Sequence, residues 1–418
     1  MKRRNLLLSG IAFLVSSVLS LAQTEFVKQI IIAEGAGGYV YVSSYNPETG
    51  ETTAFDTINT GYVQNVIVDG NTAFVAANDY VVKYNIDTYA RVDEVNVGNV
   101  NKLAVWNNQL FIGRWLSCVD GVYLKVYNKN DLSELLYEIT EVNDQTYGFA
   151  VANDTVYLAV FGGYGAPEGK IAVIDPASQS FERFIELGTD GEGIGNLLTD
   201  GYNVYFVNET YNWNGDTIGA VGIYEISTGE VFVDFYEENI GRGYAVNGTA
   251  LFLQVNGNVG TYNLYSQDLI NTNLISGPGG YDAISSVVFD KVNQKFYTAT
   301  TDYFSYGSGF IYDIYGDMTG TFDVGIATDA MAIDYRIDTD ISDLGIEKLS
   351  FGPNPVSEFL YFNEKEEVLE VYVTDVAGRK QNVKIVSGGV GVSEIKSGIY
   401  FLNISTAKGL KIARFVKI

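Results

Sequence analysis

Histidine is absent from this chain of 418 residues, and cysteine occurs only once, at Cys118. Without histidine, a Ser-His-Asp triad and metal sites that need an imidazole ligand are both excluded. A single cysteine excludes an intramolecular disulfide, and we expect Cys118 to be a buried, small apolar side chain. Any catalysis would therefore have to use carboxylates, lysine, tyrosine or a bound ion.

Basic residues are also scarce. The chain has 26 Lys and Arg against 51 Asp and Glu, a formal net charge of −25 and a predicted pI near 4.3. Such a chain repels phosphate backbones, so we expect no nucleic-acid partner. Residues 24–341 hold 42 acidic and 13 basic side chains, a net charge of −29, whereas residues 342–418 hold 9 and 10, a net charge of +1. This break predicts a domain boundary near residue 341.

Proline is rare, with six residues, whereas Tyr (31), Phe (23) and Gly (45) are abundant. This composition is typical of many short strands joined by turns. Asn65–Val97 shows the repeating unit, since it contains four β-type runs separated by turn residues. Copies of this unit recur seven times between residues 24 and 336, with a period of about 45 residues.

Four strands at this period predict the blades of a β-propeller. The first unit shows only three clear runs, and one further run, Ala330–Asp334, remains after the seventh unit. We expect this last run to complete the first blade and to close the ring, which removes an exposed sheet edge. The predicted fold is all-β, with a seven-bladed propeller over residues 24–336, although six or eight blades also fit the weak repeats.

The N-terminal residues predict export. Lys2-Arg3-Arg4 precedes an apolar segment, Leu6–Leu21, and Ser20-Leu21-Ala22 has the small-x-small pattern of a signal-peptidase site. We expect a signal peptide over residues 1–22, cleaved before Gln23. No cysteine follows for a lipid anchor, and no later stretch approaches the roughly 18–20 apolar residues that span a bilayer.

In a propeller, the loops between the second and third strands lie on the same face as the links between blades. Here those segments are rich in aromatic residues with Arg, Asn and Gly, which suits a ring-shaped organic ligand, a sugar or a protein surface. The alternative is that these aromatic residues only fill space between blades. The predicted ligand-binding residues are Tyr62, Arg114, Trp115, Tyr147, Tyr164, Tyr211, Trp213, Arg242, Tyr281, Tyr303 and Tyr306.

Other candidate chemistry is sparse. Asp338, Asp340 and Asp343 have spacing that could suit calcium, but they fit a polar linker over residues 337–348 better. The glycine-rich segment 188–195 lacks the Lys-Ser/Thr of a phosphate loop, so we expect an inter-blade link. The carboxylates of Asp190, Glu192, Glu209 and Asp216 could serve an ion or acid–base chemistry. No catalytic residue, metal site or cofactor is assigned.

After the linker, short strand-like runs predict a small Ig-like β-sandwich over residues 349–418. Its motifs are Pro353-Asn-Pro-Val-Ser, Val373-Thr-Asp-Val-Ala-Gly-Arg, Ser397-Gly-Ile-Tyr-Phe-Leu and Arg414-Phe-Val-Lys. In this order they resemble the type IX (Por) secretion sorting domain, type A, of Bacteroidetes. The resemblance implies secretion through the outer membrane, contact with the type IX machinery, and removal of the domain when the cargo is released or attached to the surface.

The propeller also resembles a family. Asn46-Pro-Glu-Thr-Gly, the Ala-Val-x-Asn/Asp openings and the long aromatic loops are similar to YncE-like surface propellers of Bacteroidetes, a group that includes the cobalamin-capturing BtuG-type proteins. The resemblance implies a secreted or cell-surface propeller that captures a small organic ligand, with cobalamin as the first candidate. BtuG-type proteins are usually lipid-anchored, whereas this chain has a sorting domain. A hydrolase or lyase using carboxylates, with or without calcium, and a protein-binding adhesin are the alternatives.

Overall fold

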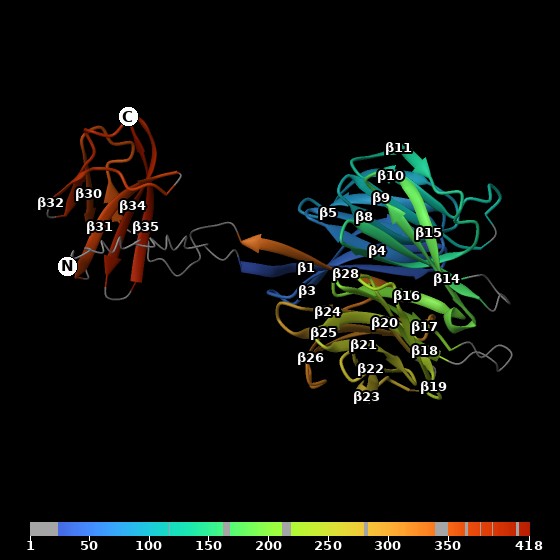
Figure 1. Ribbon diagram of the computed structural model, residues 1–418. Helices are drawn as coiled ribbons and strands as arrows, with labels where there is room; N and C mark the ends of the chain where they lie inside the picture. The colour runs from blue at the N-terminus through green and yellow to red at the C-terminus, as the bar shows by residue number, and fades with distance from the viewer. Residues whose placement is uncertain are drawn as a thin grey trace, which may run out of the picture. The chain divides into compact units, whose positions relative to one another are not determined.

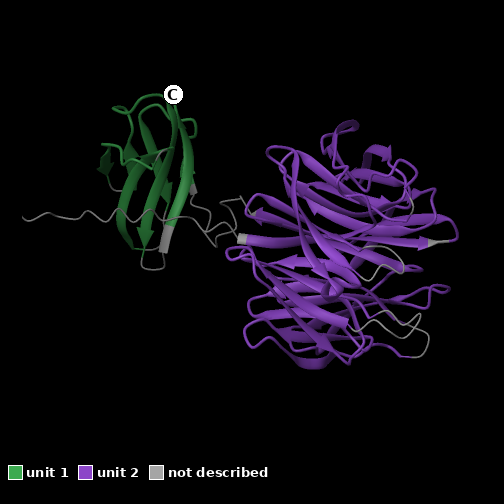
Figure 2. Cartoon of the chain, turned by 45° about the vertical axis from the view of Figure 1, so that its right-hand side comes forward, with its two compact units in different colours: residues 1–24, 338–418 green, residues 25–337 purple. Residues whose placement is uncertain are grey.

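The computed structural model describes residues 24–116, 118–161, 168–210, 219–279, 283–338, 350–363, 367–376, 378–386, 388–406 and 409–418. The chain forms two compact units: one is Glu25–Ile337, and the other contains the described residues from 350 onward (Figure 2). Apart from one 3-10 turn, η1 (Thr189–Gly191), every element of the described residues is a β-strand. In these ranges, no helix has the length and apolar character needed to cross a membrane.

In the described residues, the larger unit contains seven four-stranded sheets, arranged as the blades of a propeller (Figure 1). From the innermost strand outward, the first three blades are β28 (Thr328–Asp338), β1 (Thr24–Ala36), β2 (Tyr39–Asn46) and β3 (Glu51–Ile58); β4 (Val63–Asp69), β5 (Thr72–Ala77), β6 (Tyr80–Asn85) and β7 (Ala90–Asn96); and β8 (Val100–Trp106), β9 (Gln109–Arg114), β10 (Leu124–Asn128) and β11 (Asp131–Glu138).

The remaining four blades follow the same order. They are β12 (Thr146–Ala152), β13 (Thr155–Val160), β14 (Gly169–Asp175) and β15 (Ser180–Gly188); β16 (Ile194–Thr199), β17 (Asn203–Asn208), β18 (Gly219–Glu225) and β19 (Val231–Tyr236); β20 (Ile240–Asn247), β21 (Ala250–Val255), β22 (Asn258–Asn263) and β23 (Asp268–Ile275); and β24 (Ala283–Asp290), β25 (Lys295–Thr301), β26 (Ser308–Asp313) and β27 (Met318–Phe322). The predicted all-β, seven-bladed propeller is confirmed.

The ring closes through β28, the last strand of the propeller, which pairs with β1 at the beginning of the chain. This confirms the role predicted for the run at Ala330–Asp334. A buried amide supports the junction, because Gln29 Nε2 donates to Asp334 Oδ2 and to the carbonyl oxygen of Ile86, both at 2.9 Å. Gln29 Oε1 accepts from Ser44 Oγ at 2.6 Å and from the Tyr89 hydroxyl at 3.0 Å. One side chain thus connects β28, two strands of blade one and the outer turn of blade two.

The turns between the third and fourth strands explain why Asn and Asp recur between the strand-like runs of the repeats. At the end of β2, Asn46 Oδ1 accepts backbone N–H bonds from residues 48 and 49, and at the end of β6, Asn85 Oδ1 does the same for residues 87 and 88. A short side-chain carbonyl that bonds the backbone two and three residues ahead is the reason Asn and Asp favour turns. The sequence repeat is therefore a repeat of hairpins.

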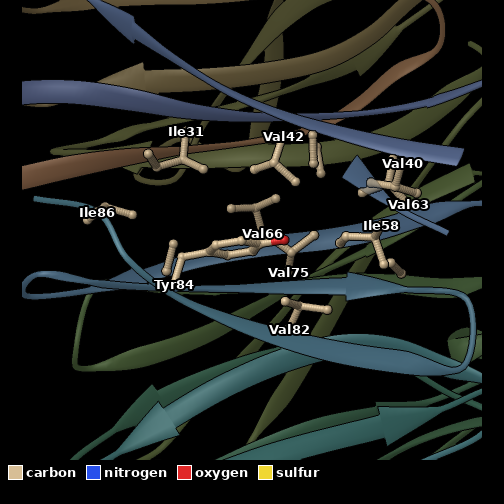
Figure 3. Close-up of a cluster of buried hydrophobic side chains, with 14 residues drawn as sticks. Ile31, Val40, Val42, Ile58, Val63, Val66, Val75, Val82, Tyr84 and Ile86 are labelled. Atoms are coloured by element: carbon tan, nitrogen blue, oxygen red, sulfur yellow. The ribbon is translucent and has the colours of Figure 1, made fainter. Parts of the chain in front are cut away.

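Apolar side chains fill the spaces between neighbouring blades. Between blades one and two, Ile31 and Val42 lie opposite Val66, Val75 and Tyr84, and all five are buried (Figure 3). Burying one Val or Ile stabilises the fold by about 1.5–3 kcal/mol relative to leaving it exposed. Since each sheet is covered on both faces by its neighbours, the inner strands read as nearly continuous apolar runs.

The smaller unit is a β-sandwich in its described residues. One sheet has the order β29 (Ser350–Gly352), β30 (Phe359–Asn363), β33 (Gly389–Gly391) and β32 (Lys384–Val386). The other has the order β31 (Val368–Asp375), β34 (Gly398–Thr406) and β35 (Gly409–Lys417). Leu360 and Val390 from the first sheet pack with Val373, Leu402 and Phe415 from the second in one buried core. The small sandwich expected at the C-terminus is thus confirmed.

The hydrogen bonds of Gln29 at the ring closure predict that replacing this residue lowers the stability of the propeller. In Gln29→Leu, the volume is kept, but several buried partners of this amide lose a hydrogen bond. Each such loss costs about 1–3 kcal/mol, so we expect the unfolding free energy of the propeller to fall by about 2–4 kcal/mol. Urea denaturation of the full chain measures this, with Glu51→Ala, an exposed change on β3, as the control. Equal midpoints for the two variants would show that this amide network does not hold the closure.

Candidate functional site

Each of the seven innermost strands in the described propeller places a polar or tyrosine side chain at its second or third residue. We call this set the axial ring. Six of its members line one cavity of about 120 Å³, and the seventh, Tyr147, lies with its ring centroid 5.9 Å from Lys102 Nζ. The axial ring consists of Gln64 (β4), Lys102 (β8), Tyr147 (β12), Asn196 (β16), Arg242 (β20), Ser285 (β24) and Asp329 (β28).

Local backbone geometry explains this placement. In β4, Val63 pairs with Ala77 and Asn65 with Ala76, so Gln64 is skipped by the ladder. A register shift occurs at the same level in all six inner pairings whose register the structure describes. A β-bulge bends the strand and redirects side chains, and bulges are frequent beside functional sites. In five of these six pairings the axial-ring residue is itself left out of the ladder, and in β16 the residue left out is Gly195, next to Asn196.

Close approach of neighbouring inner strands accompanies the bulges. A Cβ added to Gly148, next to Tyr147 in β12, would lie 2.6 Å from the backbone nitrogen of Leu197 in β16. Since real Cβ atoms are not found this close to backbone, only glycine fits here. The strands are therefore in backbone contact at this level, and the space that remains on the axis is small and polar.

Lys102 is the cation of blade three, and its side chain is half-buried. Its Nζ donates to the carbonyl oxygen of Gln64 at 2.6 Å. Burial, with a smaller contribution from the nearby Arg242 guanidinium, lowers the pKa of Lys102 to about 8, while Glu209 and Asp329 oppose the change. An amine with this pKa is partly neutral at physiological pH, so it can both bind an anion and exchange a proton.

Two carboxyl groups accompany the cations. Glu209, which directly follows β17, is half-buried; burial raises its pKa, and Arg242 and Lys102 oppose the increase. Burial likewise raises the pKa of Asp329, which accepts a hydrogen bond from the Tyr303 hydroxyl at 3.3 Å. Glu209 Oε1 and Asn196 Oδ1 are both buried and have no hydrogen-bond partner among the described residues. Buried acceptors of this kind are normally satisfied, so each of these two oxygens could accept a hydrogen bond from a donor outside the described residues.

A second, larger cavity adjoins the axial ring and shares Asp329 with it. Its volume is about 920 Å³, and we call it the aromatic cavity. Tyr62 on the link between blades one and two is 70% exposed, and Phe304 on the loop after β25 is 89% exposed. The aromatic rings that line this cavity are Tyr39, Tyr41, Tyr62, Tyr303 and Phe304. Tyr62 comes from an inter-blade link and Tyr303 and Phe304 from a loop between second and third strands, the segments expected to carry ligand-binding residues, whereas Tyr39 and Tyr41 lie on strand β2.

The structure brings some of the predicted ligand-binding residues together and not others. Tyr147 and Arg242 belong to the axial ring, and Tyr62 and Tyr303 line the aromatic cavity. Tyr306 lines a neighbouring cavity between blades seven and one. Tyr164, Tyr211, Trp213 and Tyr281 lie outside the described residues, as do Asp216, Asp340 and Asp343.

Arg114 and Trp115 do not reach this site. Arg114 is only 5% exposed, and its guanidinium donates to the carbonyl oxygens of Gly98 and Val122 and to Asp120. It therefore fixes its own loop. Trp115 is half-buried and lines neither the axial ring nor the aromatic cavity. Cys118, expected to be buried, is 8% exposed.

Sequence reasoning overlooked most of the axial ring, namely Gln64, Lys102, Asn196, Ser285 and Asp329, and it treated Glu209 as only one of several carboxylates. The axial ring could have been found from the position of polar residues within each repeat. Each inner run begins with Val, Ile, Ala or Thr, and a polar or tyrosine residue follows within two positions. Superimposing the repeats on their first strands would have shown this column. In the described residues, no group of three or more Asp, Glu or Cys side chains could hold a metal ion.

The C-terminal unit matches a known family. Residues 351–418 match the family model described as the secretion system C-terminal sorting domain. The chain therefore carries a type IX sorting domain, which directs secretion to the cell surface or beyond and implies contact with the secretion machinery. The leader peptide and the bacterial phylum remain predictions.

Solved structures share the propeller fold at low identity. One is a periplasmic gluconolactonase of Pseudomonas aeruginosa, with 12% identity, coverage of 75% of this chain and 99% of that one, and a TM-score of 0.53. Another is a Bacteroides fragilis protein described as a 6-phosphogluconolactonase, with 13% identity, coverage of 73% and 98%, and a TM-score of 0.52. A chain of the mitotic checkpoint complex has 12% identity, coverage of 72% and 96%, and a TM-score of 0.51. No curated protein sequence matches significantly. These similarities show the fold alone.

The electrostatics of the ring predict unusual reactivity at Lys102. With a pKa of about 8, this amine should react with trace acetic anhydride along a titration curve centred near pH 8. In urea the same residue should follow the ordinary lysine value of about 10.4. Peptide mass spectrometry of the labelled full chain measures both curves. Arg242→Gln removes the neighbouring positive charge and should shift the native curve to higher pH, whereas a native midpoint above pH 10 would contradict the described burial.

Proposed function

We propose that the exported propeller captures a small organic ligand, holding its polar end in the axial ring and a flat or ring-shaped part in the aromatic cavity. The observation that carries this proposal is the pair of unpartnered buried acceptors, Glu209 Oε1 and Asn196 Oδ1, beside Lys102 and Arg242. A ligand hydroxyl or ammonium group would satisfy these acceptors, and an anionic group would be stabilised by the two cations.

The lining of the two cavities indicates the ligand class. The axial cavity is lined by donors and acceptors from six blades within a small volume, and the aromatic cavity offers tyrosine and phenylalanine faces. Mixed polar groups next to aromatic faces suit a polyhydroxylated ring, such as a sugar or sugar acid, and they also suit the polar periphery of a corrinoid. The cavities favour capture of a small molecule over an adhesin, which would present a broad apolar patch without a pocket.

Secretion fits this role, since the sorting domain directs the propeller to the surface or outside the cell, where nutrients are met first. The scaffold is rigid and the candidate residues lie at strand ends and loops, so binding requires little rearrangement.

A hydrolase is the second candidate, favoured by the combination of Lys102 with Glu209. A lysine with a pKa of about 8 and a carboxyl whose pKa burial raises lie close to the range that general acid–base catalysis needs. Two solved propellers with the same fold are described as lactonases. In such a reaction, Lys102 would remove a proton from the attacking water, and the ring-opened hydroxyl would receive a proton from Glu209.

Titration calorimetry of the full chain tests capture. The panel contains cobalamin, haem, glucono-δ-lactone, gluconate and neutral and acidic oligosaccharides. For the compound that binds, Tyr62→Ala should weaken affinity about tenfold through lost stacking, and Arg242→Ala should weaken it by about a hundredfold. Tyr265→Ala, 91% exposed on an outer turn of blade six, is the matched control and should have no effect. The proposal would be contradicted if no compound of the panel gave a detectable heat of binding, or if the affinity fell equally in all three variants.

A measurement of lactone turnover distinguishes a hydrolase from a protein that only captures its ligand. Glucono-δ-lactone and related lactones are followed in a pH-stat with catalytic amounts of protein. Hydrolysis above the spontaneous rate that disappears in both Lys102→Met and Glu209→Gln would identify a lactonase, with a rate that rises through pH 8 as Lys102 loses its proton. Binding without turnover would leave capture as the function.

A further inference from the structure

A third cavity lies between blades seven and one, and it shares no residue with the axial cavity. Its volume is about 360 Å³. One wall is the sheet of blade one, and the other is the link from β27 to β28 with the loop after β25. We call it the seam pocket. It is lined by Glu34, Tyr41, Ser43, Thr52, Ala54, Tyr306, Asp323, Val324, Gly325 and Ile326.

The walls of the seam pocket are fixed by backbone contacts. Thr52 Oγ1 donates to the carbonyl oxygen of Asp323 at 3.1 Å, which ties the outer strand of blade one to the link. The N–H of Gly307 donates to the carbonyl oxygen of Gly325 at 2.8 Å, which ties the loop of blade seven to the same link. The pocket is therefore built from rigid elements of two blades.

All charged side chains that line the seam pocket are negative. Its charged side chains, Glu34 and Asp323, are both acidic, and its described lining contains no Lys or Arg. Tyr41 is 43% exposed and Tyr306 is 80% exposed, so both can turn ring faces toward a ligand, while Ala54, Val324 and Ile326 supply apolar surface. Carboxyl oxygens, aromatic faces and apolar walls together complement a cation that carries an apolar body.

Glu34 is the buried anchor of this pocket, with 6% exposure. Ser43 Oγ donates to its Oε1 at 3.2 Å, and the backbone N–H of Gly325 also bonds to the carboxyl group. A Cβ at position 325 would lie only 1.7 Å from Glu34 Oε2, so the link can approach the carboxyl group because residue 325 is glycine. Burial raises the pKa of Glu34 to about 7, in spite of both hydrogen bonds. These neutral donors leave its negative charge without a positive partner in the lining.

We propose that the seam pocket is a binding site for an organic ammonium ion, a primary or methylated amine with an aromatic or alkyl body. The ammonium group pairs with Glu34 at the inner end, and the body lies against Tyr41, Tyr306 and the apolar walls. The net charge of −25 adds a long-range attraction for cations.

Proton linkage gives the proposal a distinctive signature. The groups facing Glu34 are the Ser43 hydroxyl, the Gly325 N–H, Asp323 and the two tyrosines, so no basic residue of the lining titrates with it. An ammonium ion binds the ionised carboxylate, so affinity should be constant above pH 7 and fall about tenfold per pH unit below it.

Calorimetry of the full chain with benzylamine, and with benzyl alcohol as the uncharged counterpart, tests this site. The expected result is saturable 1:1 binding of benzylamine at pH 8, at least tenfold weaker at pH 6, with no detectable binding of the alcohol. Equal binding of both compounds, no binding of the amine, or a flat pH profile would each overturn the proposal.

Four variants place the site and separate it from the axial ring. Glu34→Gln should reduce benzylamine affinity at least tenfold, and a melting temperature at pH 8 no lower than that of the parent protein would show that it folds. Tyr306→Ala should weaken binding severalfold, whereas Tyr315→Ala, also 80% exposed, should not. Arg242→Ala should leave amine binding unchanged, because Arg242 does not line the seam pocket. Loss of binding in Arg242→Ala with full binding in Glu34→Gln would assign the amine to the axial ring instead.

Discussion

The convergence of seven inner strands on one axis is the constraint on which the rest of this structure depends. Where the strands begin, neighbouring backbones approach so closely that a side chain at Gly148 would strike β16. The antiparallel ladder is interrupted there by a bulge in every inner pairing with described register, and the axial-ring residues lie at or next to these bulges. The geometry of the fold thus places these side chains close together where the inner strands begin.

The chemistry of the axial ring follows from what occupies those positions. Lys102 and Arg242 come from blades three and six, Asp329 comes from blade one, and Glu209 enters from the second strand of blade five. Burying charges is costly unless they are compensated, and here the two signs partly compensate each other. Unpartnered acceptors remain at Glu209 and Asn196. Stability alone would favour apolar residues at these positions, and the polar ring supports the proposed ligand capture. The seam pocket contrasts with it, since its lining is acidic without a compensating cation.

Much of the fold could be predicted because each hairpin is determined by residues that are close together in the sequence. The propeller and its closure could be predicted from short apolar runs separated by Asn and Asp turns and from the unmatched run at Ala330–Asp334. The sorting domain could be predicted from the motifs near Pro353 and Gly398. The candidate site was harder to foresee. Aromatic loops drew attention to Tyr62, Tyr303 and Arg242, but Lys102 and Asp329 sit in ordinary strand-like sequence. Their proximity arises only when distant blades meet at the axis. Arg114 looked like a surface cation because its loop is unusual, yet Asp120 and two backbone carbonyls hold it in place.

The most direct test of ligand capture on the axis is a crystal structure of the protein soaked with sugar acids, lactones and cobalamin at high concentration. The account predicts density for one compound at the axial ring, with a polar atom within hydrogen-bond distance of Glu209 Oε1 or Asn196 Oδ1 and a ring against Tyr62 or Tyr303. Density confined to the opposite face of the propeller, or an axial ring filled only by ordered water at saturating ligand, would contradict it.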